Sequence, residues 1–306
     1  MKTRKVYPGE VHHVCQQTVE GVLVFYTVRD YLVFFTVFCT VARRYGIKVL
    51  SLCPMPDHIH CVIVADTEDA MAKFVQQYTH LFSREWNESR GRKGPLFKHR
   101  YMSSVKLGNK QIKTTINYSD NNPVERKMVK RAEDYRWNYL RYAQERHPYS
   151  APFKGEQKSM QFRGVLREIR SAHKGGGYLR FKQIERWSKK LSSIEMQQIA
   201  DYVINLWNVI DYEDVVSYYG NYDAFLHSLH DNTGSDYEIK EDRNSYSDAV
   251  YEECSRILLK EGLVKDLFDL PTLSIERKKE LAYVLRCRTT ARHRQIQKYL
   301  HLPPDK

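Results

Sequence analysis

The chain has 306 residues, a length that suits roughly two domains of about 150 residues each. Hydrophobic residues make up 42% and charged residues 28%, which is typical of a packed globular protein and excludes long intrinsic disorder. The net charge of +12 is uneven, because residues 1–150 hold 24 basic and 14 acidic side chains whereas residues 151–306 hold 25 and 23. This asymmetry predicts that the first half binds a polyanion.

The sequence also argues against a membrane protein. The most apolar stretch, residues 31–42, is twelve residues long, whereas a membrane span needs about 20. No apolar run follows the charges at the start of the chain, so a signal peptide is not expected. The six cysteines include no CxxC pair, which favours reduced thiols and a cytoplasmic location.

In chain order, the first half predicts alternating strands and helices. The expected elements are strands at 11–19 and 22–28, a helix at 30–45, strands at 48–53 and 58–65, a helix at 68–86, a short strand within 96–105 and a helix from about 109. Apart from the strand at 22–28, this order is typical of an α+β, ferredoxin-like antiparallel sheet with helices on one face.

The second half predicts an all-α region after a proline-bearing linker at 147–157. Helices are expected at 162–172, 178–190, 194–209, 224–229, 247–259, 274–287 and 291–300, with residues 158–270 forming a bundle and 231–246 mobile. Trp187 and Trp207 are expected in its core. We therefore divide the chain into domains 1–150 and 151–306. Residues 274–302 resemble part of a helix-turn-helix module, which leaves an added DNA contact there open.

The first candidate for chemistry is His58-Ile59-His60. On a strand, residues i and i+2 point to the same face, so the two imidazoles stand side by side. With a third ligand from elsewhere they could hold a divalent cation. The alternative is a pair of structural histidines on a sheet.

The second candidate lies at Tyr118 and Asn122, which share a face if this segment is helical. A phenol beside a carbonyl-oxygen ligand suits metal-assisted phosphoryl transfer. The competing interpretation is that Asn122 caps a new helix, because Pro123 and Glu125 then occupy favourable positions in its first turn.

The third feature is a basic and aromatic region. Residues 84–146 hold 16 Lys or Arg against 7 Asp or Glu, interleaved with rings at positions 97, 101, 135, 137, 139 and 142. Basic side chains follow a phosphate backbone and exposed rings stack on unpaired bases, so we favour nucleic-acid binding. The alternative is a solvated helix face above core aromatics.

Together these features resemble a known family. Met55-Pro56-Asp57-His58-Ile59-His60 is similar to the "MPNHxH" strand of HUH single-strand DNA endonucleases. The segments 94–97, 118–124 and 135–137 resemble later blocks of one branch, the REP-associated tyrosine transposases, which are relatives of the single-tyrosine insertion-sequence transposases. The resemblance covers about residues 9–145.

This resemblance implies a role for each matching residue. His58 and His60 match the paired metal ligands, Tyr118 the nucleophile and Asn122 the third metal ligand. The DNA-binding residues expected from the basic region are Arg92, Lys93, Lys98, Arg100, Arg126 and Lys127. The chain departs from the family pattern at Asp57, where asparagine is usual, and in having Tyr-Ser-Asp-Asn-Asn-Pro where "YIHLNP" is familiar.

The implied activity is cleavage and rejoining of single-stranded or hairpin DNA, formed by imperfect palindromes, through a 5′-phosphotyrosine and a free 3′-OH. The implied cofactor is Mg²⁺ or Mn²⁺, and no nucleotide cofactor is needed. A monomer and a homodimer both stay open. Two rival hypotheses are a non-catalytic, regulatory protein that binds DNA palindromes and an RNA-binding module on the same sheet.

Overall fold

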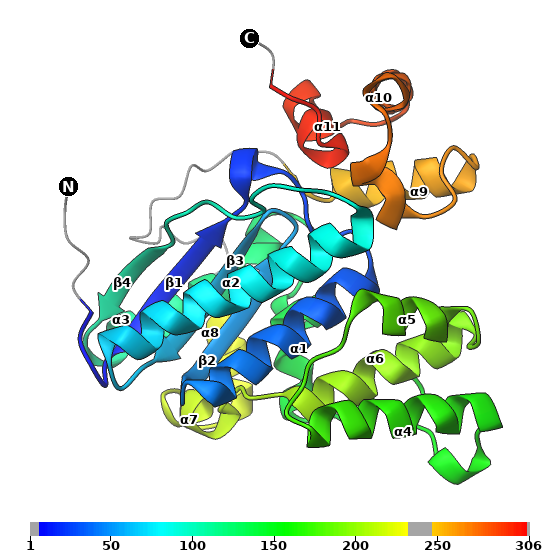
Figure 1. Cartoon of the computed structure of the whole chain (residues 1–306). Coiled ribbons are helices and arrows are strands. Elements are labelled where there is room, and N and C mark those ends of the chain that lie inside the picture. The colour runs from blue at the N-terminus through cyan, green and yellow to red at the C-terminus, as the bar shows by residue number, and fades with distance from the viewer. Residues whose placement is uncertain (1–5, 232–246, 305–306) are drawn as a thin grey trace.

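A computed structural model describes residues 6–231 and 247–304. Its centre is a four-stranded antiparallel sheet (Figure 1). The strands are β1 (Val11–Gln17), β2 (Lys48–Met55), β3 (His58–Val64) and β4 (Met102–Lys106), in the spatial order β2-β3-β1-β4. This is the ferredoxin-like arrangement, so the predicted α+β fold is confirmed.

Helices cover both faces of the sheet. Helices α1 (Val28–Arg44) and α2 (Glu68–Arg90) lie on one face, and α3 (Gly108–Glu125) lies on the other. The prediction of helices on one face is therefore wrong for α3. The reason is that Leu50 and Val62 point away from α1 and α2, and Ile116 of α3 shields them from water.

The predicted strand at 22–28 does not form. Its proposed partner β1 already pairs with β3 on one side and β4 on the other, so no edge is left for a hairpin. The segment instead runs past the end of the sheet, where the backbone N–H of Val24 donates to Pro56. It ends at Thr27, which caps α1.

A buried ion pair joins the start of α1 to the end of α2. Arg90 donates to Asp30 over 2.6 Å, and both side chains are fully buried. Asp30 also accepts from the backbone of Thr27 within the capping box of α1. Removing either partner would leave a buried charge uncompensated, which typically costs about 3–5 kcal/mol, so this pair specifies how the two helices meet.

The helices of the second half form three groups that pack on different sides of the sheet region (Figure 1). Helices α4 (Met160–Lys174), α5 (Phe181–Ser188) and α6 (Ser193–Trp207) extend the core around α1, whereas α7 (Tyr212–Ser217) and α8 (Tyr222–Asp231) pack beside α3. Helices α9 (Val250–Lys260), α10 (Ile275–Arg288) and α11 (His293–Leu300) share a core of their own.

All seven predicted helices are present, and Trp187 and Trp207 are buried as predicted. Sequence periodicity missed α7, which is only six residues long. The single bundle expected over 158–270 is wrong, because these helices divide among the three groups. Of the segment predicted to be mobile, residues 232–246 lie outside the described residues.

The segment 147–157 is tied to α6. The backbone N–H of Tyr149 and the hydroxyl of Ser150 both donate to the buried Asp201 carboxylate.

None of the helices within residues 6–231 and 247–304 combines the length and apolar composition that a membrane span needs.

Helix α11 is attached to the end of the sheet by its last residues. Leu23 donates its N–H to the carbonyl of Lys298, and Nε2 of His301 donates to the carbonyl of Leu23 over 2.6 Å. The His301 ring also stacks on Trp86. Burial lowers the pKa of His301 to about 3, although the hydrogen bond to Leu23 opposes this shift.

This depressed pKa predicts acid-sensitive stability. An unfolded histidine takes up a proton near pH 6.5 but the folded His301 does not, so stability falls as the pH drops below about 6.5. Between pH 7 and pH 5 the contribution is about 2 kcal/mol. Urea denaturation across this range should show a decline that is smaller by that amount in His301→Gln. Parallel stability curves for the two proteins would contradict this assignment.

Candidate active site

Strand β3 and helix α3 bring the four predicted site residues together. Strand alternation places His58 and His60 on the face that α3 covers, with ring centroids 4.8 Å apart. Tyr118 and Asn122, one helical turn apart on α3, both lie near His60. All four side chains are buried.

The helical phase of α3 follows from polar contacts on its other sides. Asn117 and Asn121 donate to Ser228 and Leu229 of α8. On the side of β2, Asp120 accepts a hydrogen bond from Ser51, and its burial raises the pKa of Asp120 to about 8. Because these polar groups must find partners once buried, the remaining side of α3 faces β3.

His60 is the centre of the cluster. Its Nε2 lies 3.1 Å from Nδ2 of Asn122, and its Nδ1 lies 3.0 Å from Nε2 of His13 on β1. The Tyr118 ring stands edge-on to both imidazoles, at 5.4 Å from His60 and 5.8 Å from His13. Since an Asn amide donates through nitrogen, His60 accepts at Nε2 and carries its proton at Nδ1, toward His13.

Sequence reasoning missed His13. The signal was present, because His13 follows Val11 by two residues on the predicted first strand and so shares its face. What the sequence did not contain was the register of β1 on β3. In this register His13 lies opposite Val62, and His60 is the next residue of β3 on the same face.

The helix-cap interpretation of Asn122 is wrong. Asn122 lies in the last turn of α3, which continues through Pro123 to Glu125, and its carbonyl accepts the N–H of Arg126. No helix begins here, so the side chain has no N–H groups of a first turn to cap and is directed at His60 instead.

The donor set fits a divalent cation. Oδ1 of Asn122 is buried and accepts no hydrogen bond from the described residues. A carbonyl oxygen and two imidazoles are ligand types that first-row divalent ions accept. Within the described part of the chain, no three His, Cys, Asp or Glu side chains are grouped to hold a metal, and Asn122, whose amide contacts His60, can supply an oxygen as a third ligand.

Asp57 supports His58 from behind. Its carboxylate lies 2.6 Å from Nδ1 of His58 and 3.3 Å from Nζ of Lys298. Burial opposes ionisation, but the hydrogen bond and charge of His58, with the charge of Lys298, lower the pKa of Asp57 well below its usual range. Asp57 stands where the family that the sequence resembles usually has asparagine, and its carboxylate still supplies a hydrogen-bond acceptor that orients the His58 imidazole.

A polar pocket of about 320 Å³ opens beside His58. Its walls carry four cations, Lys98, Arg126, Arg294 and Lys298, against the two acids Glu20 and Asp57. Arg294 and Lys298 come from α11, one turn apart. Sequence reasoning left a DNA contact at 274–302 open but did not foresee that α11 would line this pocket.

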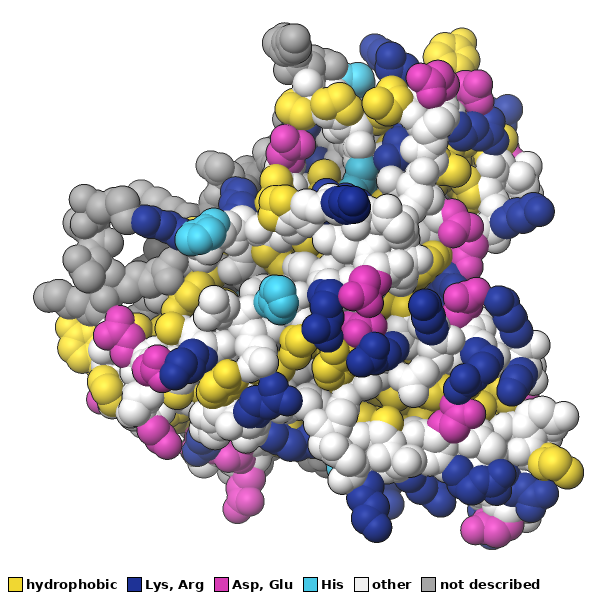
Figure 2. Space-filling model, in the orientation of Figure 1, with side chains coloured by type: hydrophobic (Ala, Val, Ile, Leu, Met, Phe, Trp, Pro, Cys, Tyr) yellow, Lys and Arg dark blue, Asp and Glu magenta, His cyan; other side chains and the backbone are white. Residues whose placement is uncertain are grey.

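The six predicted DNA-binding residues are not all in one place. Lys98 and Arg126 line the pocket beside His58. Lys98 and Arg100 also line a groove of about 1120 Å³ between α2 and the segment leading to β4, together with Arg84. Arg92, Lys93 and Lys127 line neither. Figure 2 shows that on the pictured face basic side chains stand among acidic ones and do not form one continuous patch.

The aromatic side chains of the basic region are mostly core. Phe97, Tyr135, Trp137, Tyr139 and Tyr142 are all buried. The expectation of exposed stacking rings is therefore wrong for these five, because they fill the space between the sheet, α1 and the helices of the second half.

Comparison with known proteins supports one family. Residues 10–122, which include all four predicted site residues, match the model of the IS200-like transposases, so the resemblance found in the sequence is confirmed for this segment. The match supports a transposase role, and with it DNA binding. A solved structure of a REP-associated tyrosine transposase bound to a REP hairpin is 16% identical, covering 47% of this chain and 87% of its own, with a TM-score of 0.39. No curated protein matches.

Proposed function

Because residues 10–122 match the IS200-like transposases, we propose that this protein is a single-tyrosine DNA strand transferase, dependent on Mg²⁺ or Mn²⁺, that acts on single-stranded or hairpin DNA. The observation that carries this proposal is the convergence of α3 on one imidazole. Tyr118 packs against the ring of His60, and Asn122 reaches the Nε2 of that ring. Residues 1–150 are the proposed catalytic domain.

In the proposed reaction, the Tyr118 oxygen attacks the scissile phosphorus and the bond to the 3′ oxygen breaks. The DNA 5′ end stays on Tyr118 as a phosphotyrosine, while the phenol loses a proton and the 3′ oxygen gains one. Attack by a 3′-OH on the phosphotyrosine is the reverse step and rejoins DNA. One phosphodiester is exchanged for another, so the reaction needs no nucleotide cofactor.

His58, His60 and Asn122 are the residues that would hold the cation, with the Asn122 amide turned so that Oδ1 takes the place of Nδ2 beside His60 and Nε2 of His60 is released for the cation. When bound, Mg²⁺ or Mn²⁺ supplies positive charge that offsets the charge developing on the scissile phosphate. The chain orients these ligands. Asp57 contacts Nδ1 of His58, and Nε2 of His13 contacts Nδ1 of His60. The ligands are therefore preorganised by β1 and the turn before β3.

Cations outside this cluster would hold the rest of the strand. The groove beside α2 and the pocket beside His58 share Lys98, so a continuous phosphate backbone could contact both. Single-strand binding by such grooves is largely electrostatic. In this proposal, α11 forms the far wall of the pocket through Arg294 and Lys298.

The nucleophile is tested by Tyr118→Phe. This change keeps the ring that packs on His60 but removes the attacking oxygen, so the covalent protein–DNA adduct should disappear while hairpin binding persists. A labelled hairpin oligonucleotide and a denaturing gel measure the adduct. Tyr283→Phe, an identical change at an exposed position, is the control. An adduct that persists in Tyr118→Phe would contradict the assignment, and binding without an adduct in the unaltered protein would favour the non-catalytic palindrome-binding function.

The metal site is tested with a matched pair at Asn122. Asn122→Leu removes the orphaned oxygen, so Mn²⁺ binding should weaken at least about tenfold, the least expected even for an outer-shell partner. Asn122→Asp keeps an oxygen ligand and should retain binding. Calorimetric titration of both folded variants with Mn²⁺ makes the comparison. Equal affinities for the Leu variant and the unaltered protein would show that Asn122 is no ligand.

The contribution of α11 is tested by salt dependence. On single strands, log K falls with log[salt] by about 0.7 per phosphate contact, so Arg294→Ala with Lys298→Ala should reduce the slope by about 1.4. Lys279→Ala with Arg286→Ala removes two exposed charges from α10 and serves as the control. If both double variants change the slope equally, the pocket holds no DNA phosphate and the cations act only through net charge.

A further inference from the structure

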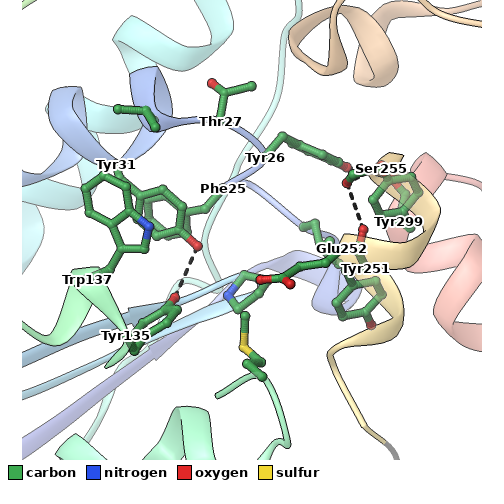
Figure 3. A pocket seen from close by; sticks show the side chains of 14 residues that line it. Phe25, Tyr26, Thr27, Tyr31, Tyr135, Trp137, Tyr251, Glu252, Ser255 and Tyr299 are labelled. Atoms are coloured by element: carbon green, nitrogen blue, oxygen red, sulfur yellow. Dashed lines mark hydrogen bonds between the residues drawn. The ribbon is translucent and has the colours of Figure 1, made fainter. Parts of the chain in front are cut away.

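A second pocket, of about 300 Å³, lies between the sheet region and the C-terminal helices. Figure 3 shows its two aromatic walls, with Tyr31, Tyr135 and Trp137 on one side and Tyr251 and Tyr299 on the other. The Tyr31 and Trp137 rings stack at 4.1 Å, and the Tyr251 and Tyr299 rings are nearly parallel. The volume is at the lower end of ligand pockets, so it suits one small planar group.

The polar groups of these walls are largely used internally. The hydroxyl of Tyr135 donates to the Pro54 carbonyl, and that of Tyr299 lies 2.8 Å from Oγ of Ser255. The hydroxyl of Tyr26 donates to the carbonyl of Tyr299. Since the Tyr31 ring is stacked against both Phe25 and Trp137, the walls offer a ligand mainly ring edges and the faces of the other rings, to which planar aromatic groups bind by stacking.

Charge narrows the choice of ligand. No Lys or Arg is among the described residues that line this pocket, although the protein carries a net charge of +12. The acidic side chain Glu252 lies between the two walls (Figure 3). Its carboxylate makes no ion pair or hydrogen bond with the described residues. A phosphate is disfavoured here, whereas an amino group on an aromatic ring can donate to Glu252.

The position of the pocket connects it to the proposed active site. Pro56 lines the aromatic pocket, whereas Asp57 and His58 line the cationic one. Likewise Lys298 lines the cationic pocket and the next residue, Tyr299, lines the aromatic one. The two pockets therefore lie on opposite sides of one short connection between the sheet and α11.

We propose that the aromatic pocket binds one unpaired, amino-bearing nucleobase of the DNA whose phosphates occupy the cationic pocket. This inference rests on the proposed function for its DNA ligand but not on cleavage. The base stacks against the aromatic walls, and its exocyclic amino group donates to Glu252. Adenine, cytosine and guanine carry such a group and thymine does not, so the pocket discriminates against thymine.

The test uses the full chain with Tyr118→Phe, which keeps DNA uncleaved, and a hairpin oligonucleotide with a single-stranded 5′ extension. An abasic site is moved along the extension one position at a time. At one position the loss of the base should weaken binding about tenfold or more, the size expected for one base–aromatic stack. At that position 2-aminopurine fluorescence should fall on binding, and thymine should bind less well than adenine.

Two variants connect this position to the pocket. Val28→Trp replaces a small lining side chain with an indole that fills the pocket and should abolish the abasic penalty, while Glu252→Gln should reduce the preference for adenine over thymine. Glu253→Gln, the same change at the next residue of α9, does not line the pocket and is the control. Glu252 is exposed, so Glu252→Gln keeps the test valid if Val28→Trp fails to fold.

The outcomes separate this inference from the proposed function. A flat abasic profile overturns the base pocket even if the unaltered protein cleaves DNA. So does an abasic penalty unchanged in folded Val28→Trp, or a preference for adenine over thymine unchanged in Glu252→Gln. A preference for adenine over thymine that Glu252→Gln reduces and Glu253→Gln does not supports the pocket even if no covalent adduct ever forms. Failure to bind any DNA overturns both.

Discussion

The constraint on which the site depends is the burial of a polar helix. Helix α3 lies between the sheet and α8, yet residues 117–122 are all polar or aromatic and all buried. Each polar group must find a partner there, since an unmet one costs about 1–3 kcal/mol. Asn121 binds α8 and Asp120 binds β2, so only the third side of the helix is left to face β3. These contacts fix the orientation of α3 about its own axis, and in that orientation Tyr118 and Asn122 contact His60.

This arrangement explains why a proline is tolerated so close to the site. Pro123 lacks an N–H and disrupts the ladder of a helix interior, but here it falls in the final turn. The carbonyls of Asn122 and Pro123 are then satisfied by the N–H groups of Arg126 and Met128. The helix ends at Glu125, three residues after Asn122. Arg126 is thereby delivered to the cationic pocket.

Local sequence periodicity was sufficient to predict which of the site residues share a face of their strand or helix. The spacing of two on a strand predicted that His58 and His60 share a face, and the spacing of four predicted the same for Tyr118 and Asn122. What failed needed tertiary knowledge. The strand predicted at 22–28 had no free edge of β1 to pair with, and the rings at Tyr135 and Trp137 were packed rather than exposed. His13 and α11 could not be placed, because neither a register nor a contact spanning over 240 residues is written in local sequence.

The C-terminal helices add side chains to the pockets at the end of the sheet. By itself the end of the sheet offers His58, Asp57 and two cations. Helix α11 adds Lys298 to the cationic pocket and Tyr299 to one wall of the aromatic pocket. These two consecutive residues therefore line pockets of different character. Consecutive residues on a helix point about 100° apart, so a single turn of α11 wedged against Leu23 can line both pockets at once. The attachment of α11 by His301 therefore couples the placement of Lys298 in the cationic pocket to that of Tyr299 in the aromatic pocket.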